Sequence, residues 1–217
     1  MRKVALTILC SLLLLPSLAL AQVDCPECLL GLWDEVGLVN NFGAMSAGVP
    51  KDIYLGVKVP PSETGLTGVE FSIAGVRQVE DGILVLGVTP LSPTMTILGS
   101  AVAPADTSTT SMGTGRMNIA WPECQVITGG SLAVARVQLL SFGAVVDKVF
   151  KVKRGYPSSN MTNYPFNPVL VRCDFPTLTT VKMREGCYIA GYSGAPPPAC
   201  SVAVEEATWG GVKSLFN

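Results

Sequence analysis

Residues 66–73 constrain the fold most, because apolar side chains alternate there with small or polar ones without a break. The apolar positions are Val69, Phe71 and Ile73, and the positions between them are Gly68, Glu70 and Ser72. A period of two residues is that of a β-strand with one buried face. The stretch therefore predicts a half-buried strand.

Strand-like runs lie on both sides of this stretch, and almost nothing helical does. Strands are predicted at residues 30–34, 52–59, 66–73, 83–88, 95–102, 117–121, 132–140, 145–152, 169–173, 178–183 and 187–192. Turn signals rich in Gly and Pro separate them at intervals of about ten residues, which is typical of a β-sandwich or barrel. Residues 132–140 and 145–152 flank a short segment and are predicted to form a hairpin. We expect an all-β, antiparallel β-sandwich of immunoglobulin-like or jelly-roll type.

The last residues depart from this pattern. Thr208 can cap a short helix over residues 208–216, whose Trp209, Val212 and Phe216 fall on one face. Gly210 and Gly211 each cost such a helix roughly 1 kcal/mol, so it needs Trp209 to dock on the sheets. We expect the helix to plug the open end of the sandwich; an exposed recognition tail is the alternative.

Residues 1–21 have the pattern of a secretory signal peptide. Arg2 and Lys3 precede an apolar run, and Ala19-Leu20-Ala21 fits a small-residue cleavage site. A membrane anchor is the alternative, but Pro16 and two serines interrupt the run, which is shorter than the roughly 20 residues of a spanning helix. The sequence therefore predicts export, to the extracellular space or the periplasm, of one β-sandwich domain over residues 22–217.

Six cysteines remain once Cys10 leaves with the signal peptide. They are Cys25, Cys28, Cys124, Cys173, Cys187 and Cys200. An even number in an exported chain predicts three disulfides, among 15 pairings. The crowding of three cysteines near the C-terminus favours Cys173 with Cys187 or Cys200, and Cys124 would tie the middle of the chain to one end.

The motif Cys25-Pro-Glu-Cys28 has the spacing of a redox dithiol. A redox role calls for a helix N-terminus after a strand, in a βαβ context, which the surrounding sequence lacks. Structural bridging, either local or to other cysteines, is therefore the preferred interpretation. A zinc site of four cysteines is a weaker one, because no second such motif follows.

The composition excludes several kinds of chemistry. The chain has no histidine, which removes imidazole catalysis and histidine-ligated metals. Its net charge of −1, without a basic stripe, excludes the electrostatic footprint of a nucleic-acid binder. Acidic residues that are neighbours in the sequence would point to opposite faces of a strand and so make poor catalytic pairs. These neighbours are Asp34 and Glu35, Glu80 and Asp81, and Glu205 and Glu206. We expect no catalytic residue, metal or cofactor.

Aromatic side chains offer a platform for sugar rings as an alternative. The candidates are Trp33, Tyr54, Trp121, Tyr164 and Tyr192. Trp121 alternates with Met117 and Ile119, so it is predicted to lie in the core. Tyr164, in a polar loop, is the one aromatic expected to be exposed.

Five segments resemble a group of exported β-sandwich proteins of environmental bacteria to which no activity is assigned. They are residues 31–34 (GLWD), 67–71 (TGVEF), 123–125 (ECQ), 173–176 (CDFP) and 204–215 (VEEATWGGVKSL). Residues 52–102 are also loosely similar to cohesin-type sandwiches. That resemblance implies binding of dockerin modules or assembly of surface scaffolds, although the six cysteines and the tail at Trp209 depart from it.

We therefore expect an exported, non-catalytic structural or adhesive protein of the cell exterior. Its partner would be another extracellular protein or a second copy, bound through a sheet edge or the tail. A carbohydrate-binding module is the alternative, and a carboxylate-dependent hydrolase comes third. Neither nucleic acid nor a membrane span of the mature chain is expected.

Overall fold

The computed structural model describes residues 22–75, 82–100, 116–153, 167–174, 178–192 and 194. The signal peptide (1–21), the helix predicted at 208–216, Tyr164, Cys200 and the carboxylate pairs at 80–81 and 205–206 lie outside these residues. The described part is all-β, and none of it forms a helix that could span a bilayer.

The described residues form twelve strands. They are β1 (Gln22–Trp33), β2 (Phe42–Gly43), β3 (Lys51–Lys58), β4 (Gly65–Ala74), β5 (Ile83–Pro90), β6 (Thr96–Ser100), β7 (Arg116–Val126), β8 (Ser131–Ser141), β9 (Lys148–Lys153), β10 (Val169–Arg172), β11 (Thr180–Glu185) and β12 (Cys187–Ala190). Eleven of these strands correspond to predicted ones, although β1 begins earlier and β7 ends later than expected, and the short β2 was not predicted.

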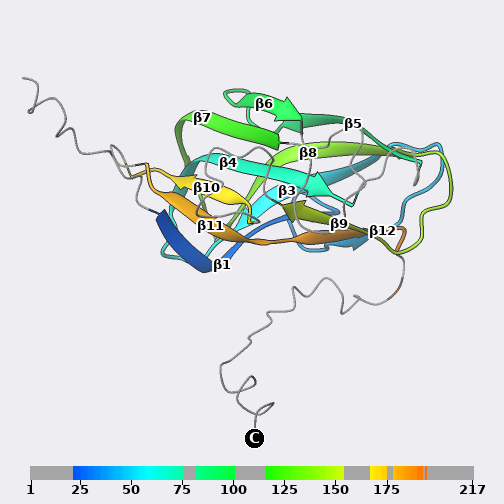
Figure 1. Ribbon diagram of the computed structural model, residues 1–217, viewed down its shortest axis with the longest axis horizontal. Helices are drawn as coiled ribbons and strands as arrows, with labels where there is room; N and C mark the ends of the chain where they lie inside the picture. Colours follow the sequence, from blue (N-terminus) through cyan, green and yellow to red (C-terminus); the bar gives the residue numbers. More distant parts are fainter. Residues whose placement is uncertain are drawn as a thin grey trace, which may run out of the picture.

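The strands make one continuous sheet that folds over into a sandwich (Figure 1). One layer holds β5, β8 and β3; the other holds β6, β7, β4, β10 with β9, and β11 with β12. Strand β1 joins them, because its first part pairs with β11 and its last part with β3. The predicted sandwich is therefore confirmed.

The sheet is mixed, so the expectation of an antiparallel sandwich is wrong in part. Strands β1 and β11 run parallel, as do β2 and β12. Side chains alternate in the same way in both orientations, and these partners lie far apart in the sequence. No local pattern could therefore reveal their direction.

The predicted hairpin of residues 132–140 and 145–152 is also wrong. Strand β8 pairs with β3 and β5, whereas β9 pairs with β4 and β12. The connecting residues carry the chain from one layer to the other instead of turning it back, and Asp147 has a positive φ of 47° there.

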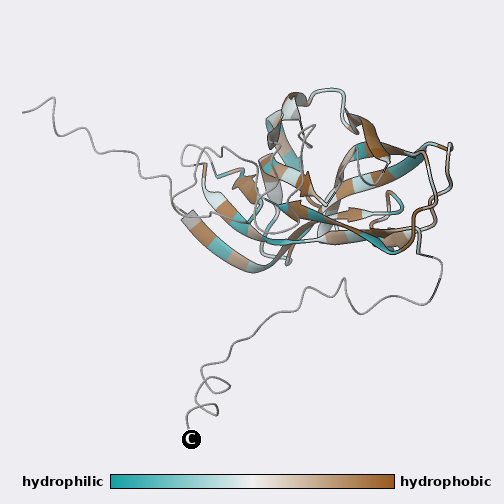
Figure 2. Ribbon diagram, turned by 45° about the vertical axis from the view of Figure 1, so that its right-hand side comes forward, coloured by the Kyte–Doolittle hydropathy of each residue, from teal (hydrophilic) through white to brown (hydrophobic). Residues whose placement is uncertain are grey.

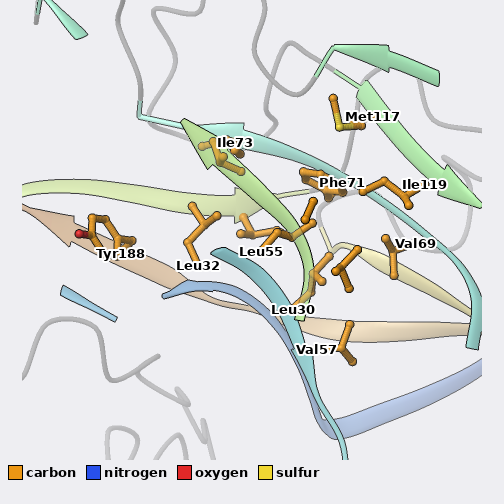
Figure 3. Packing of buried hydrophobic residues seen from close by; sticks show 14 of the residues in the cluster. Leu30, Leu32, Leu55, Val57, Val69, Phe71, Ile73, Met117, Ile119 and Tyr188 are labelled. Carbon is orange, nitrogen blue, oxygen red and sulfur yellow. The ribbon is translucent and has the colours of Figure 1, made fainter. Parts of the chain in front are cut away.

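The core lies between the two layers (Figure 3). Val69, Phe71 and Ile73 of β4 are buried as the alternation predicted, and they share one cluster with Leu55 and Val57 of β3. The same alternation can be followed along the strands in Figure 2, where hydrophobic and hydrophilic residues succeed one another.

Strand β4 is more deeply buried than predicted, because its second face is covered too. All ten of its residues are buried, including Gly68, Glu70 and Ser72. On that face, Glu70 is 8% exposed and Ser72 is fully buried. Strand β4 therefore lies in the interior of the molecule, not at a half-wet face.

Disulfides tie the sheet at one end. Cys25 is bonded to Cys28, and Cys124 of β7 is bonded to Cys173, just after β10. The expected bond from Cys173 to Cys187 or Cys200 is therefore wrong, because β7 and β10 both flank the first half of β4, which brings Cys124 close. Cys187 is also disulfide-bonded.

Candidate interaction surface

Three strands lie at edges of the folded sheet in the described residues: β5, β6 and the two-residue β2, which pairs only with β12. Among the described residues, β5 pairs only with β8 and β6 pairs only with β7. Residues 91–95 carry the chain from β5 in one layer to β6 in the other, so these two strands lie on one side of the sandwich, the upper side in Figure 1. We call β5, β6 and residues 91–95 between them the open side.

The open side carries no charge and several exposed leucines. Residues 83–100 contain no Lys, Arg, Asp or Glu. Their inward side chains, Ile83, Val85, Val88, Met95 and Ile97, pack on the core. Leu86, Leu91 and Leu98 point away from it and are 47%, 42% and 60% exposed. Proteins commonly protect sheet edges with charged side chains, which are lacking here.

The backbone of the open side limits how far another strand could extend the sheet. The register of β5 against β8 shifts between Val85 and Gly87, so Leu86 lies at a β-bulge. Pro90 ends β5 without an N–H to donate. A bulge commonly re-aims a side chain. The open side therefore presents leucine side chains more than a long hydrogen-bonding edge.

A polar face borders the open side. Asp52 of β3 accepts hydrogen bonds from Arg136 and Gln138 of β8, at 3.5 and 3.0 Å. Arg136 and Gln138 in turn lie opposite Thr89 and Gly87 of β5. Apolar contacts beside satisfied polar groups are the usual arrangement of a protein interface, with a core and a rim.

The aromatic candidates do not form a sugar platform in the described residues. Trp121 is buried in the core, as predicted, and Trp33 is buried with the Lys58 Nζ atom 5.5 Å from its ring centroid. Tyr192 packs edge-on against Phe42, with the ring centroids 5.7 Å apart. Tyr54 is half-buried on β3.

The carboxylates at 34 and 35 are engaged in separate contacts. Asp34 Oδ1 accepts a hydrogen bond from the Tyr188 hydroxyl at 2.6 Å and pairs with Lys51 Nζ at 2.7 Å. Glu35 accepts from the Asn40 side chain at 2.9 Å. Both groups therefore hold the loop after β1 in place, and the two do not face each other across a cleft.

A polar cleft at the disulfide end was missed by sequence reasoning. Residues 62–65 and 172–174 line a volume of about 470 Å³. There Arg172 donates to both carboxylate oxygens of Glu63, which is 8% exposed. Hydrogen bonding to Glu63 raises the pKa of Arg172, against the effect of burial. Glu63 and Arg172 lie 109 residues apart, so no local signal could have paired them.

Asp174 at the rim of this cleft is also held by a neighbour. Its carboxylate accepts hydrogen bonds from the backbone N–H of Thr179, at 2.8 Å, and from the Thr179 hydroxyl. Burial alone would raise the pKa of Asp174, but these bonds outweigh it and the pKa is lowered. Asp174 is therefore charged over the whole neutral range.

No protein-family model matches the chain, and no curated protein matches it either. Among solved structures, a cohesin module of a family 33 glycoside hydrolase from Clostridium perfringens is similar, with 12% identity over 74% of this chain and 94% of that chain, and a TM-score of 0.47.

Two further cohesins are similar at the same level. The sixth cohesin of scaffoldin B from Acetivibrio cellulolyticus, solved with a dockerin, is 10% identical over 77% of this chain and 99% of that one, with a TM-score of 0.46. A non-cellulosomal cohesin of Archaeoglobus fulgidus is 10% identical over 76% and 89%, with a TM-score of 0.40. The structure thus shows the same loose resemblance to cohesin-type modules as the sequence. Because the TM-scores are below 0.5, neither a partner nor an activity is inferred from this resemblance.

Proposed function

We propose that the chain is a non-catalytic, exported module of the cell exterior that assembles with a second copy of itself through the open side. The observation that carries this proposal is the pair of uncharged edge strands with their exposed Leu86, Leu91 and Leu98. Burying such side chains lowers the free energy by about 25 cal/mol per Å² of apolar surface removed from water.

The charge pattern favours a second copy over a foreign partner. In a two-fold symmetric contact, the same patch is used on both subunits, so a charge near the axis faces its own copy. Residues 83–100 hold no charge that could be repelled in this way. The role that follows is structural or adhesive: two copies joined at their open sides form a dimer outside the cell.

Light scattering with size-exclusion chromatography tests the proposal on the oxidised chain of residues 22–217. We expect a dimer whose fraction grows with concentration, and a monomer for the double variant Leu86→Lys/Leu98→Lys. Val146→Lys is the matched control, since Val146 is 75% exposed on the connection between β8 and β9, away from the open side.

Two results would count against self-assembly. One is a strictly monomeric wild type at the highest attainable concentration. The other is a dimer that the double lysine variant leaves intact while Val146→Lys breaks it. If a foreign protein bound to the open side and no dimer formed, the open side would still be an interaction surface, but the proposed second copy would be wrong.

A further inference from the structure

In the part of the chain that the structure describes, a group of side chains that could hold a metal ion lies away from the open side, at the disulfide end. The Sγ atoms of Cys25 and Cys28 and a carboxylate oxygen of Glu63 lie within 4.8 Å of one another, and all three residues are buried. The two cysteines come from β1, and Glu63 comes from the turn between β3 and β4.

The backbone of β1 brings both sulfurs to the same place. Between Asp24 and Leu29, β1 advances five residues while its partner β11 advances only two, from Lys182 to Arg184. The segment Cys25-Pro-Glu-Cys28 is thus a bulge in an otherwise regular parallel ladder. Cys25 is 7% exposed and Cys28 is fully buried, so the bulge turns both sulfurs toward Glu63.

From this arrangement we propose that Cys25, Cys28 and Glu63 form a zinc site whenever the Cys25–Cys28 disulfide is reduced. Two thiolates and a carboxylate are ligands that Zn²⁺ accepts, and Zn²⁺ prefers four-coordinate sites. Glu63 also lines the polar cleft, so a fourth ligand would have to enter from that side. This inference is independent of the assembly proposed above.

Arg172 is a suitable outer partner for this site. It donates through Nε and Nη2, one hydrogen bond to each oxygen of Glu63. A carboxylate has about four lone-pair positions, so Glu63 can keep both bonds and still bind a cation. Hydrogen bonding of this kind orients ligating carboxylates and tunes metal affinity.

The charge of the buried group also fits. Zn²⁺ with two thiolates and one carboxylate carries one negative charge, which the Arg172 guanidinium balances. The disulfide form is neutral as well, because there Glu63 and Arg172 balance each other. The two forms therefore exchange without leaving an unpaired charge in the interior, which would be costly.

The exchange balances in two steps. A dithiol supplies two electrons and two protons and becomes a disulfide itself; a phosphine supplies the two electrons and becomes a phosphine oxide, while water provides its oxygen and the two protons. Either reductant breaks the S–S bond and leaves two thiols. Each thiol then loses its proton to solvent as its sulfur binds the cation. Zinc binding therefore releases two protons and weakens as the pH falls.

The test uses the full chain, which is reduced with a phosphine under anaerobic conditions. After the phosphine has been removed, the protein is titrated with Co²⁺ and then with Zn²⁺. We expect one Co²⁺ per chain with a sulfur-to-metal charge-transfer band, displaced by Zn²⁺. Cys25→Ser should abolish the band. Glu63→Gln and Arg172→Met should weaken binding about 10- to 100-fold. Glu123→Gln, an exposed carboxylate next to Cys124, is the matched control.

Alkylation of the reduced wild type keeps the test decisive if a variant fails to fold. Zn²⁺ should slow the reaction of Cys25 and Cys28 with iodoacetamide relative to the metal-free reduced protein, and leave the reaction of Cys124, Cys173 and Cys187 unchanged. Mass spectrometry of peptides gives the readout. Equal protection of all cysteines, or Co²⁺ binding unchanged in Glu63→Gln and Cys25→Ser, would overturn the proposal.

Discussion

Tyr188 forms a hydrogen bond between two segments that lie far apart in the sequence. Its fully buried ring stacks on Phe150, with the centroids 6.3 Å apart, and its hydroxyl reaches Asp34. Gly43 makes this contact fit, because a Cβ at that position would lie 2.7 Å from the Tyr188 hydroxyl oxygen. A hydrogen bond to a charged acceptor contributes about 1.5–3 kcal/mol.

Tyr188→Phe should therefore lower the free energy of unfolding at pH 7 by about 1.5–3 kcal/mol. Urea denaturation measures the loss, with Tyr54→Phe on the half-buried outer face of β3 as the control. Equal losses in both variants would show that the Asp34 contact contributes nothing special.

The same residue gives a dependence on pH. Burial raises the pKa of Tyr188, and the hydrogen bond to Asp34 and its charge raise it further. A tyrosine in the unfolded chain ionises near about pH 10. The stabilisation is thus complete below that pH and is lost as the pH rises above it. Above about pH 10, the free energy of unfolding of the wild type should fall with pH more steeply than that of Tyr188→Phe, by up to about 1.4 kcal/mol per pH unit.

The Glu63–Arg172 pair gives a second prediction at this scale. Arg172→Met leaves a buried carboxylate without its guanidinium, at a cost of about 1–3 kcal/mol, since the Arg172 side chain is 27% exposed. Glu63→Leu/Arg172→Met removes both charges and should cost less than Arg172→Met alone. A double-mutant cycle by urea denaturation checks this, and a double variant as costly as the sum of the single ones would contradict it.

Strand β1 and the junction of β11 with β12 approach each other closely. The Gly186 N–H donates to the Leu30 carbonyl at 2.8 Å, and a Cβ on Gly31 would lie 3.3 Å from the Gly186 Cα. Two facing glycines therefore allow β1 to pass from one layer to the other at this point.

Gly186→Ala should destabilise the fold by about 1–3 kcal/mol, because its Cβ would overlap the backbone of Gly31. Gly87→Ala on β5 is the matched control, since nothing lies within 4 Å of a Cβ there. Thermal unfolding of both variants gives the comparison. A loss in Gly87→Ala as large as in Gly186→Ala would mean that the close approach is not the cause.

The positions of the elements could be predicted from sequence, but their neighbours could not. Alternation in residues 52–59 and 66–73 marked β3 and β4 almost to the residue, since it reflects one buried face. The same signal does not say which strand lies alongside, so β8 and β9 were wrongly paired. The open side was predicted only as a kind of surface, because an edge strand is defined by the partner it lacks.

For the whole molecule, the two described disulfides differ in what they restrain. Cys124–Cys173 closes a loop of 49 residues, whereas Cys25–Cys28 spans three. The entropy of loop closure assigns about 4 kcal/mol to the first and about 2 kcal/mol to the second.

Replacing both cysteines of a pair by serine tests this difference. We expect Cys124→Ser/Cys173→Ser to lower the free energy of unfolding about twice as much as Cys25→Ser/Cys28→Ser does, measured by urea denaturation of the oxidised protein. The opposite order would mean that packing around the Cys25–Cys28 bulge outweighs chain entropy.

Strand β1 pairs in parallel with β11, although more than 140 residues separate them in the chain. A contact of such high sequence separation forms late and slowly, since the intervening chain must be ordered first. On the ribosome, the sandwich therefore stays unclosed until β11 has been synthesised. Until then the first part of β1 lacks its β11 neighbour, although its last part can already pair with β3.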